Sequence, residues 1–275
     1  MDPDLWLTAV AALWGAAVGL LVPRAAYRFA VEPDETWRDR CPDGHPITGI
    51  ARGWLGLAGC VACADSVRMS AISRVPSTFR RSSASSTFRA SRTSSYGPGT
   101  PRTALTTALV CAGLALATGT RPELGVWLLL APLGVLLAVV DFRVQRLPDA
   151  LTLPLAVGAL GLLGVVAAVP EHVGDWPTAL FGALGLGGAY FLLFLINPNG
   201  MGFGDVKLAP GLGAVLGWYG WGTVVLGTFA GFLFGGLYGL GLVIARRAGR
   251  KTSIPFGPFL IAGAYIGLLI GAFAA

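Results

Sequence analysis

Eight long apolar segments constrain this chain more than any other feature of its sequence. They cover residues 5–22, 104–119, 124–140, 151–169, 179–197, 206–218, 223–245 and 258–274. Most have the roughly 17 to 25 residues that a helix needs to cross a hydrocarbon core of about 30 Å, and only 12% of all residues are charged. We therefore expect an all-α, polytopic membrane bundle of about eight transmembrane helices, in which the short sixth segment is marginal.

The distribution of Lys and Arg predicts the orientation of this bundle. Twelve of the twenty basic residues lie between Arg24 and Arg102, and residues 246–251 hold four more. Because cytoplasmic loops carry the excess of Lys and Arg, we place the N-terminus outside and the loop after the first helix in the cytoplasm. Arg121, in a tight loop with Glu123, lies on the opposite side from the other basic residues. Basic residues gathered in membrane loops argue for lipid as the partner and against nucleic acid.

We expect three regions: a first transmembrane helix over 1–22, a cytoplasmic loop region over 23–103, and a transmembrane domain over 104–275 that carries the chemistry. Within the loop region, residues 66–103 contain eleven Ser and seven Arg with few large aliphatic residues. Such a composition neither spans lipid nor builds a core, so we expect this stretch to be disordered or loosely structured.

The loop region also contains a C-x-x-C pair formed by Cys60 and Cys63. A structural zinc site needs four ligands, and the nearby candidates for the other two are Cys41 and His45. The sequence leaves a zinc site at Cys41, Cys60 and Cys63 open without favouring it, and His45 is interpreted as an ordinary loop residue.

Two acidic residues stand at the ends of apolar segments. Asp141 directly follows the segment 124–140, and Asp205 directly precedes the segment 206–218. Because two segments lie between them, both carboxylates return to the same side of the membrane. Acids at membrane depth are costly and therefore mark function. If two such carboxylates meet, one stays ionised while the other keeps a proton, which is the arrangement that aspartic peptidases use.

The residues around these acids have proposed supporting roles. Gly202 and Gly204 precede Asp205, where glycine permits unusual backbone angles and a close approach of substrate backbone. Asp149 is interpreted as the N-cap of the helix that begins near Leu151. Lys207 either holds a carboxylate or marks the cytoplasmic interface, and the sequence does not distinguish these roles.

These motifs resemble those of the prepilin peptidase, or type IV leader peptidase, family. The stretch from Asp141 to Pro148-Asp149 resembles the first aspartate motif of that family, and Gly202-Phe-Gly-Asp205-Val-Lys207 resembles the second. The sequence Ile254-Pro-Phe-Gly-Pro-Phe259 before the last segment is also similar. The resemblance is good over 124–275 and weak over about 1–63.

The resemblance implies an aspartic endopeptidase with Asp141 and Asp205 as its catalytic pair. Its substrates would be prepilins or pseudopilins, whose basic leader is cut at the cytoplasmic face of the inner membrane after a Gly that precedes an apolar stem. Members of the family commonly also methylate the new N-terminus with S-adenosylmethionine, an activity tied to the first cytoplasmic loop. Here residues 66–103 replace the apolar helix usual in that loop, through either a divergent insert or two compensating frame errors, so S-adenosylmethionine is expected only if methyl transfer is retained.

Two alternative interpretations remain open at the level of sequence. A presenilin-like protease would share the G-x-G-D motif, although Val140 rather than Tyr precedes Asp141 here. A transporter or channel would use the two acids to bind a proton or a cation. Transport favours acids near the membrane midplane and inverted repeats, whereas these acids lie at segment ends and no repeat is visible.

Overall fold

The computed structural model describes residues 3–32, 35–64, 96–198, 200–245 and 254–275, and within these ranges each regular element is a helix. Two short helices, α2 (Val22–Phe29) and α3 (Ile50–Gly53), belong to the N-terminal part. The long helices are α1 (Pro3–Gly19), α5 (Thr100–Thr118), α6 (Glu123–Val144), α7 (Asp149–Val166), α8 (Trp176–Ile196), α9 (Phe203–Gly217), α10 (Trp221–Ile244) and α11 (Gly257–Ala274). The predicted all-α architecture is confirmed, and each of the eight apolar segments forms a helix.

Fewer than eight of these helices are long enough to span a bilayer. In the described part of the chain, α5, α6, α7, α8, α10 and α11 pass by length and apolarity, and α1 with α2 adds a seventh if this pair, bent by 41°, counts as one span. Helix α9, at 15 residues, is too short. Its side chains are nevertheless largely buried, because it packs against α7, α8 and α11. The sequence-based count of about eight spans is therefore reduced to six or seven.

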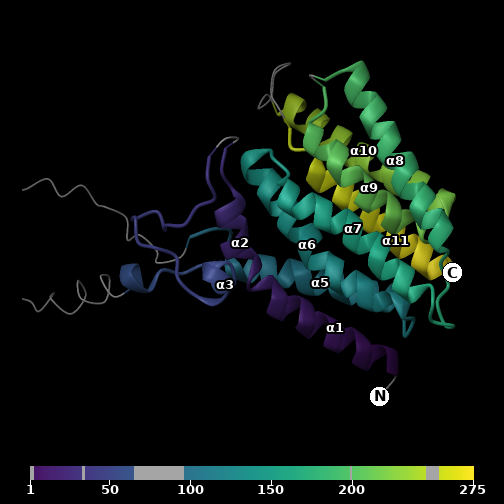
Figure 1. Ribbon diagram of the computed structural model, residues 1–275, viewed down its shortest axis with the longest axis horizontal. Coiled ribbons are helices and arrows are strands. Elements are labelled where there is room, and N and C mark those ends of the chain that lie inside the picture. The colour runs from purple at the N-terminus through teal and green to yellow at the C-terminus, as the bar shows by residue number, and fades with distance from the viewer. Residues whose placement is uncertain (1–2, 33–34, 65–95, 199, 246–253) are drawn as a thin grey trace, which may run out of the picture.

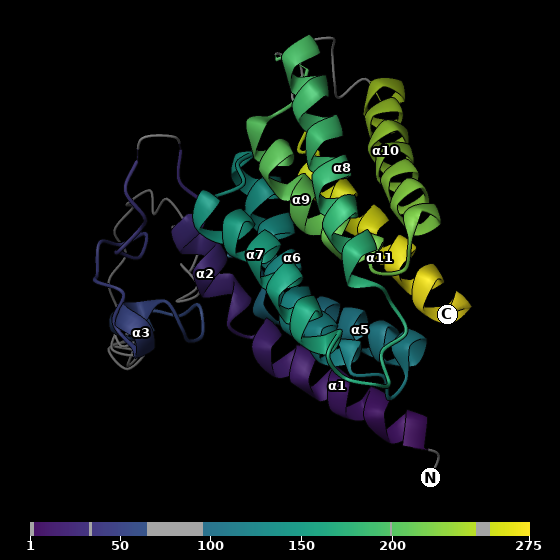
Figure 2. The ribbon, with the colours of Figure 1, turned by 45° about the vertical axis from the view of Figure 1, so that its right-hand side comes forward.

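The helices run between two distinct ends of the bundle. Both termini lie at one end, whereas α2, the described residues 35–64 of the loop region and the turn between α6 and α7 lie at the opposite end (Figures 1 and 2). We call these the terminal end and the loop end. The loop region thus shares its end of the bundle with the last turn of α6 and the first turn of α9, which carry the two acids.

Neighbouring helices approach closely where small residues face each other. Helices α8 and α9 meet at Gly182 and Gly213, where an added Cβ on either glycine would collide with the backbone of the other. Between membrane helices, packing of this kind replaces the hydrophobic driving force that lipid does not supply. It holds α9 in the centre of the bundle in spite of its short length.

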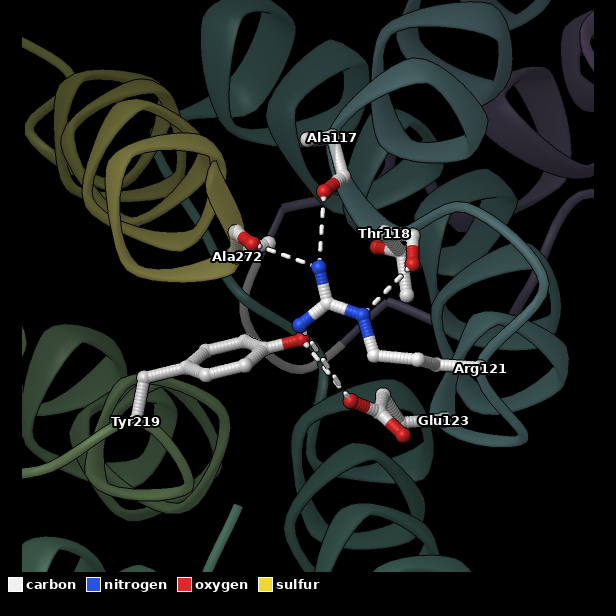
Figure 3. Close-up of polar contacts among 6 residues, drawn as sticks. All are labelled: Ala117, Thr118, Arg121, Glu123, Tyr219 and Ala272. Atoms are coloured by element: carbon white, nitrogen blue, oxygen red, sulfur yellow. Dashed lines mark hydrogen bonds and ion pairs between the residues drawn. The ribbon is translucent and has the colours of Figure 1, made fainter. Parts of the chain in front are cut away.

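A buried ionic network closes the terminal end (Figure 3). Arg121 donates hydrogen bonds to the carbonyls of Thr118 at 2.7 Å, Ala117 at 3.2 Å and Ala272 at 2.6 Å. Its Nη1 lies 3.9 Å from Oε1 of the fully buried Glu123, which also accepts a hydrogen bond of 3.4 Å from the Tyr219 hydroxyl. Arg121 is therefore a partner in an internal tie between α5, α6 and α11, which explains why it breaks the charge pattern of the loops.

Two sequence-based expectations concern residues that the structure does not describe. The Ser- and Arg-rich stretch 66–103 falls mostly within 65–95, and the basic cluster 246–251 falls within 246–253. Both of these ranges lie outside the described residues.

Candidate active site

Asp141 occupies the last turn of α6 and is 4% exposed. The helix ends because Gln145 adopts a left-handed conformation, with φ of 51°, and donates its backbone N–H to the carbonyl of Asp141 at 2.8 Å. The Asp141 carboxylate accepts a hydrogen bond of 3.1 Å from the backbone N–H of Gly257 in the first turn of α11. A Cβ at Gly257 would lie 2.9 Å from Asp141 Oδ2, so a larger residue there would displace the Asp141 carboxylate.

Asp205 occupies the first turn of α9 and is 7% exposed. A carboxylate is favourable there because the free N–H groups and the dipole of a helix give its N-terminus a partial positive charge. Among the described residues neither Asp141 nor Asp205 takes part in an ion pair. The structure thus brings the two acids from separate helices to the loop end of the bundle.

A polar pocket of about 280 Å³ opens in front of the two acids. Its lining residues are Asp141, Gln145, Arg146, Leu147, Asp149, Gly202, Phe203, Gly204, Asp205 and Lys207. All six residues singled out from the sequence at this site therefore line one pocket. A peptide backbone entering the pocket would meet the carboxylates of Asp141 and Asp205. The other charged lining residues are Arg146 and the Asp149–Lys207 pair.

Leu147 joins the two halves of the site, and it gives Gly204 a different role from the expected one. A Cβ at Gly204 would lie 3.0 Å from Leu147 Cβ, and a Cβ at Gly257 would lie 3.2 Å from Leu147 Cδ1. Gly202 has φ of −69°, an angle open to any residue, and Gly204 lies inside α9. The expectation that these two glycines supply unusual backbone angles is therefore wrong, and Gly204 instead makes room for Leu147.

Asp149 and Lys207 pair beside the pocket. Helix α7 begins at Asp149 itself with Pro148 as its N-cap, so the predicted N-cap role of Asp149 is wrong. Its two carboxylate oxygens accept hydrogen bonds from Lys207 Nζ at 2.7 Å and 2.8 Å. Of the two roles left open for Lys207, the structure shows that it holds a carboxylate. The pair links the first turns of α7 and α9 next to Asp205.

A separate cluster of metal-binding side chains lies in the loop region. Cys41, His45, Cys60 and Cys63 each present one ligand atom, and all four atoms lie within 4.8 Å of one another. Desolvation, together with hydrogen bonds to Cys60, Asp43 and Cys41, raises the pKa of the Cys63 thiol above its ordinary value. Three sulfur atoms and one imidazole nitrogen are the ligand set of a structural zinc site, so these residues fit zinc. The interpretation of His45 as an ordinary loop residue missed this contact, although its position four residues after Cys41 pointed to it.

We call the part of the chain around this cluster, residues 35–64 with Tyr96, the cysteine lobe. Two buried arginines of α2 anchor it to the bundle. Arg24 donates to the carbonyls of Thr48 at 3.2 Å and Leu55 at 3.1 Å, and Arg28 donates to the carbonyl of Arg52 at 2.8 Å. The lobe therefore sits at the loop end.

Comparison with known proteins decides which family has this arrangement. The sequence profile of the type IV leader peptidase family matches residues 127–240, which include both acids and the Asp149–Lys207 pair. A prepilin leader peptidase/N-methyltransferase of Pseudomonas putida is 30% identical over 278 residues, covering 98% of this chain and 93% of the relative. The chain belongs to the type IV leader peptidase family. The family resemblance drawn from the motifs is thereby confirmed.

Other members of the leader peptidase family match a smaller part of the chain. A prepilin leader peptidase/N-methyltransferase of Aeromonas salmonicida (strain A449) is 36% identical over 173 residues, which are 62% of this chain and only 56% of the relative. The Leader peptidase HopD of Salmonella typhimurium is 34% identical over 142 residues, or 50% of this chain and 86% of the relative. No solved structure shows a significant match to the chain.

Proposed function

We propose that this protein is an aspartic endopeptidase that removes the basic leader from prepilins or pseudopilins, with Asp141 and Asp205 as its catalytic pair. The observation that carries the proposal is the convergence of these two buried acids on one polar pocket. The names of the relatives, prepilin leader peptidases, support the substrate class. No observation favours the transporter alternative, because the acids lie at helix ends beside a pocket and not at the middle of the bundle.

The proposed mechanism uses one ionised and one protonated carboxylate. The ionised acid takes a proton from a water molecule as that water attacks the scissile carbonyl, and the protonated acid donates its proton to the carbonyl oxygen. As the tetrahedral intermediate collapses, the acid that took the water proton gives it to the leaving amine, and the other acid takes back the proton of the re-forming carbonyl, which restores the pair to its starting state. The Gly257 N–H fixes the orientation of the Asp141 carboxylate, and the Asp149–Lys207 pair fixes the first turn of α9, which carries Asp205.

The proposed setting is the bacterial inner membrane. The helical bundle and the bacterial relatives are those of a multi-pass inner-membrane protein. We further propose that the loop end faces the cytoplasm and that the N-terminus lies outside, as the Lys and Arg distribution predicts. Cleavage would then occur at the cytoplasmic face, where the pocket meets the basic leader.

Cleavage of a prepilin by the purified protein tests the proposed activity. The protein in lipid nanodiscs is incubated with a full-length prepilin, and intact mass identifies the product. We expect loss of the leader with the wild type and with Glu171→Gln, an exposed control. We expect no product with Asp141→Asn or Asp205→Asn. Full cleavage by either variant would remove that residue from the proposed pair.

We also propose that Cys41, His45, Cys60 and Cys63 hold a structural zinc ion that rigidifies the cysteine lobe. Zinc supplies folding free energy here and takes no part in proteolysis. Elemental analysis of the purified protein should find about one zinc per chain in the wild type and in the control Cys111→Ser, and much less in Cys60→Ser. The proposal would be contradicted if wild-type protein without zinc unfolded at the same temperature as wild-type protein with zinc.

Methyl transfer remains a separate prediction. The relatives are named N-methyltransferases as well as leader peptidases, and that activity would require S-adenosylmethionine. Incubating the cleaved prepilin and the protein with labelled S-adenosylmethionine tests whether this chain retains it. A labelled product would show that methyl transfer survives the unusual composition of residues 66–103.

A further inference from the structure

A second, larger cavity of about 360 Å³ lies between α5, α6 and α11. Leu155 of α7 and Leu212 of α9 also contribute to its wall. None of its lining residues carries a charge, and apart from Thr106, Tyr265 and the Trp127 indole all lining side chains are purely apolar. Such a cavity excludes water-soluble ligands. Its occupant must be a lipid chain or an apolar polypeptide segment.

The cavity follows one face of α6 along most of its length. The α6 residues that line it are Trp127, Leu130, Ala131, Gly134, Val135, Ala138, Val139 and Phe142. Their spacing of three and four residues is that of a single helix face. Fifteen residues of helix rise about 22 Å, which is most of a hydrocarbon core of about 30 Å. The cavity is therefore an elongated groove parallel to α6, and we call it the α6–α11 groove.

The groove leads to the pocket that contains the two acids. At its loop end it is lined by Phe142 and Pro258. Phe142 directly follows Asp141, and Pro258 directly follows Gly257, whose N–H donates to the Asp141 carboxylate. The groove thus ends one residue in sequence from Asp141, which itself lines the polar pocket, and the two cavities share no lining residue. A segment lying in the groove would deliver its end to the carboxylates.

We infer that the α6–α11 groove binds the apolar stem helix of the substrate, an inference that rests on the proposed function. A prepilin changes from polar leader to apolar stem close to the scissile bond. Along the last turn of α6 the lining changes in the same sense, from the polar pocket at Asp141 to the apolar groove at Phe142. Seating the stem in the groove therefore sets which peptide bond reaches the two acids.

The dimensions of the groove agree with contact by one face of a helix. A volume of about 360 Å³ is too small to enclose a helix but accepts several large apolar side chains from one face. The α6 wall of the groove contains the small residues Ala131, Gly134 and Ala138. Small residues of this kind let a partner helix approach closely. On the opposite wall, Ala262 of α11 is also small.

The inference is tested by filling the groove and comparing two substrates. One substrate is a full-length prepilin, and the other is a soluble peptide that contains the leader and scissile bond but no stem. We expect Ala262→Phe to raise the ratio of the KM for the full-length prepilin to the KM for the peptide by about tenfold. The control is Val225→Phe on α10, where Val225 is 67% exposed. This variant should leave the KM ratio at the wild-type value.

The peptide separates failure of the inference from failure of the proposed function. If the wild type cleaves neither substrate, the proposed function fails. If Ala262→Phe cleaves the peptide, and so is folded, but shows the wild-type KM ratio, the stem does not use the groove and the inference is overturned.

A photocrosslinker distinguishes the stem from lipid. It is placed at Val135 in the groove, or at Val225 as the control, in an Asp205→Asn background that holds substrate without cutting it. We expect the Val135 position to crosslink to the prepilin stem and the Val225 position to crosslink to lipid. Crosslinks from Val135 to lipid alone, with prepilin in excess, would overturn the inference.

Discussion

The two ends of the bundle both bury acidic side chains, but they treat them differently. At the terminal end, fully buried Glu123 faces the Arg121 guanidinium, which is itself held by three carbonyls (Figure 3). At the loop end, Asp141 and Asp205 line an open polar pocket together, and in the described residues neither has an ion-pair partner. An acid paired with a cation ties helices together, whereas two neighbouring acids without a cation can share one proton and so serve as proton donor and acceptor.

The strongest way to break this comparison is to remove one acid at the loop end. Asp141→Asn or Asp205→Asn should lower the rate of prepilin cleavage by at least about 10³-fold, because each removes a proton donor or acceptor of the reaction. Neither should lower the thermal unfolding midpoint, because Asn has the shape of Asp and is always neutral, so it puts no unpaired charge in a buried position. A large loss of stability in both variants would mean that these acids are structural.

The converse change at the terminal end should affect stability and not chemistry. Glu123→Ala removes the counter-charge of the half-buried Arg121 guanidinium and leaves a cavity at a fully buried position, which should cost about 3 kcal/mol of unfolding free energy. Thermal unfolding in detergent measures the loss, with exposed Glu171→Ala as the control. Cleavage per folded molecule should stay at the wild-type level, and a fall comparable to that of Asp205→Asn would contradict the separation of the two ends.

Lys207→Met sharpens the comparison from within the loop end. The Asp149–Lys207 pair is partly exposed, so its loss should change the unfolding free energy by less than about 1 kcal/mol. Because the pair positions the first turn of α9, we expect kcat for prepilin cleavage to fall several-fold. Lys207→Arg should recover part of that loss, and an unaltered kcat in Lys207→Met would remove the pair from the site.

The smallest expected effect comes from Tyr219→Phe at the terminal end. This change deletes the hydroxyl that donates to Glu123 at 3.4 Å and leaves the Arg121 contacts in place. The loss should be about 1 kcal/mol of unfolding free energy, measured as a small drop in the thermal midpoint. A loss as large as that of Glu123→Ala would show that Tyr219, and not Arg121, is the main partner of the buried acid.

Sequence patterns predicted the helices and the placement of both acids at one end of the bundle because both depend on local rules. Apolar length identifies membrane helices, and counting crossings places Asp141 and Asp205 at the same end. The pattern was less informative where distant side chains meet. The contact of His45 with Cys60 and Cys63, the Asp149–Lys207 pair and the hydrogen bond from Gly257 to Asp141 all join residues whose approach depends on packing.

The Arg121–Glu123 pair at the terminal end is another contact that the sequence pattern did not predict. Arg121 contradicted the loop charge pattern, and the composition alone offered no reason. The reason is the carbonyl of Ala272 and the carboxylate of Glu123, which convert a surface charge into an internal one. Similarly, the α6–α11 groove depends on how α5, α6 and α11 pack together, and no spacing within one helix encodes that packing.

The central claim is that Asp141 and Asp205 of one chain face each other, and site-directed crosslinking tests it most directly. A protease site is inserted at the exposed Glu171, so that cleavage yields two fragments, of which the second contains no native cysteine. With Asp141→Cys and Asp205→Cys combined, a short bismaleimide should keep the fragments joined at the mass of one chain, whereas Asp205→Cys alone should not. Fragments that separate in the combined variant, although both thiols react, would contradict the claim.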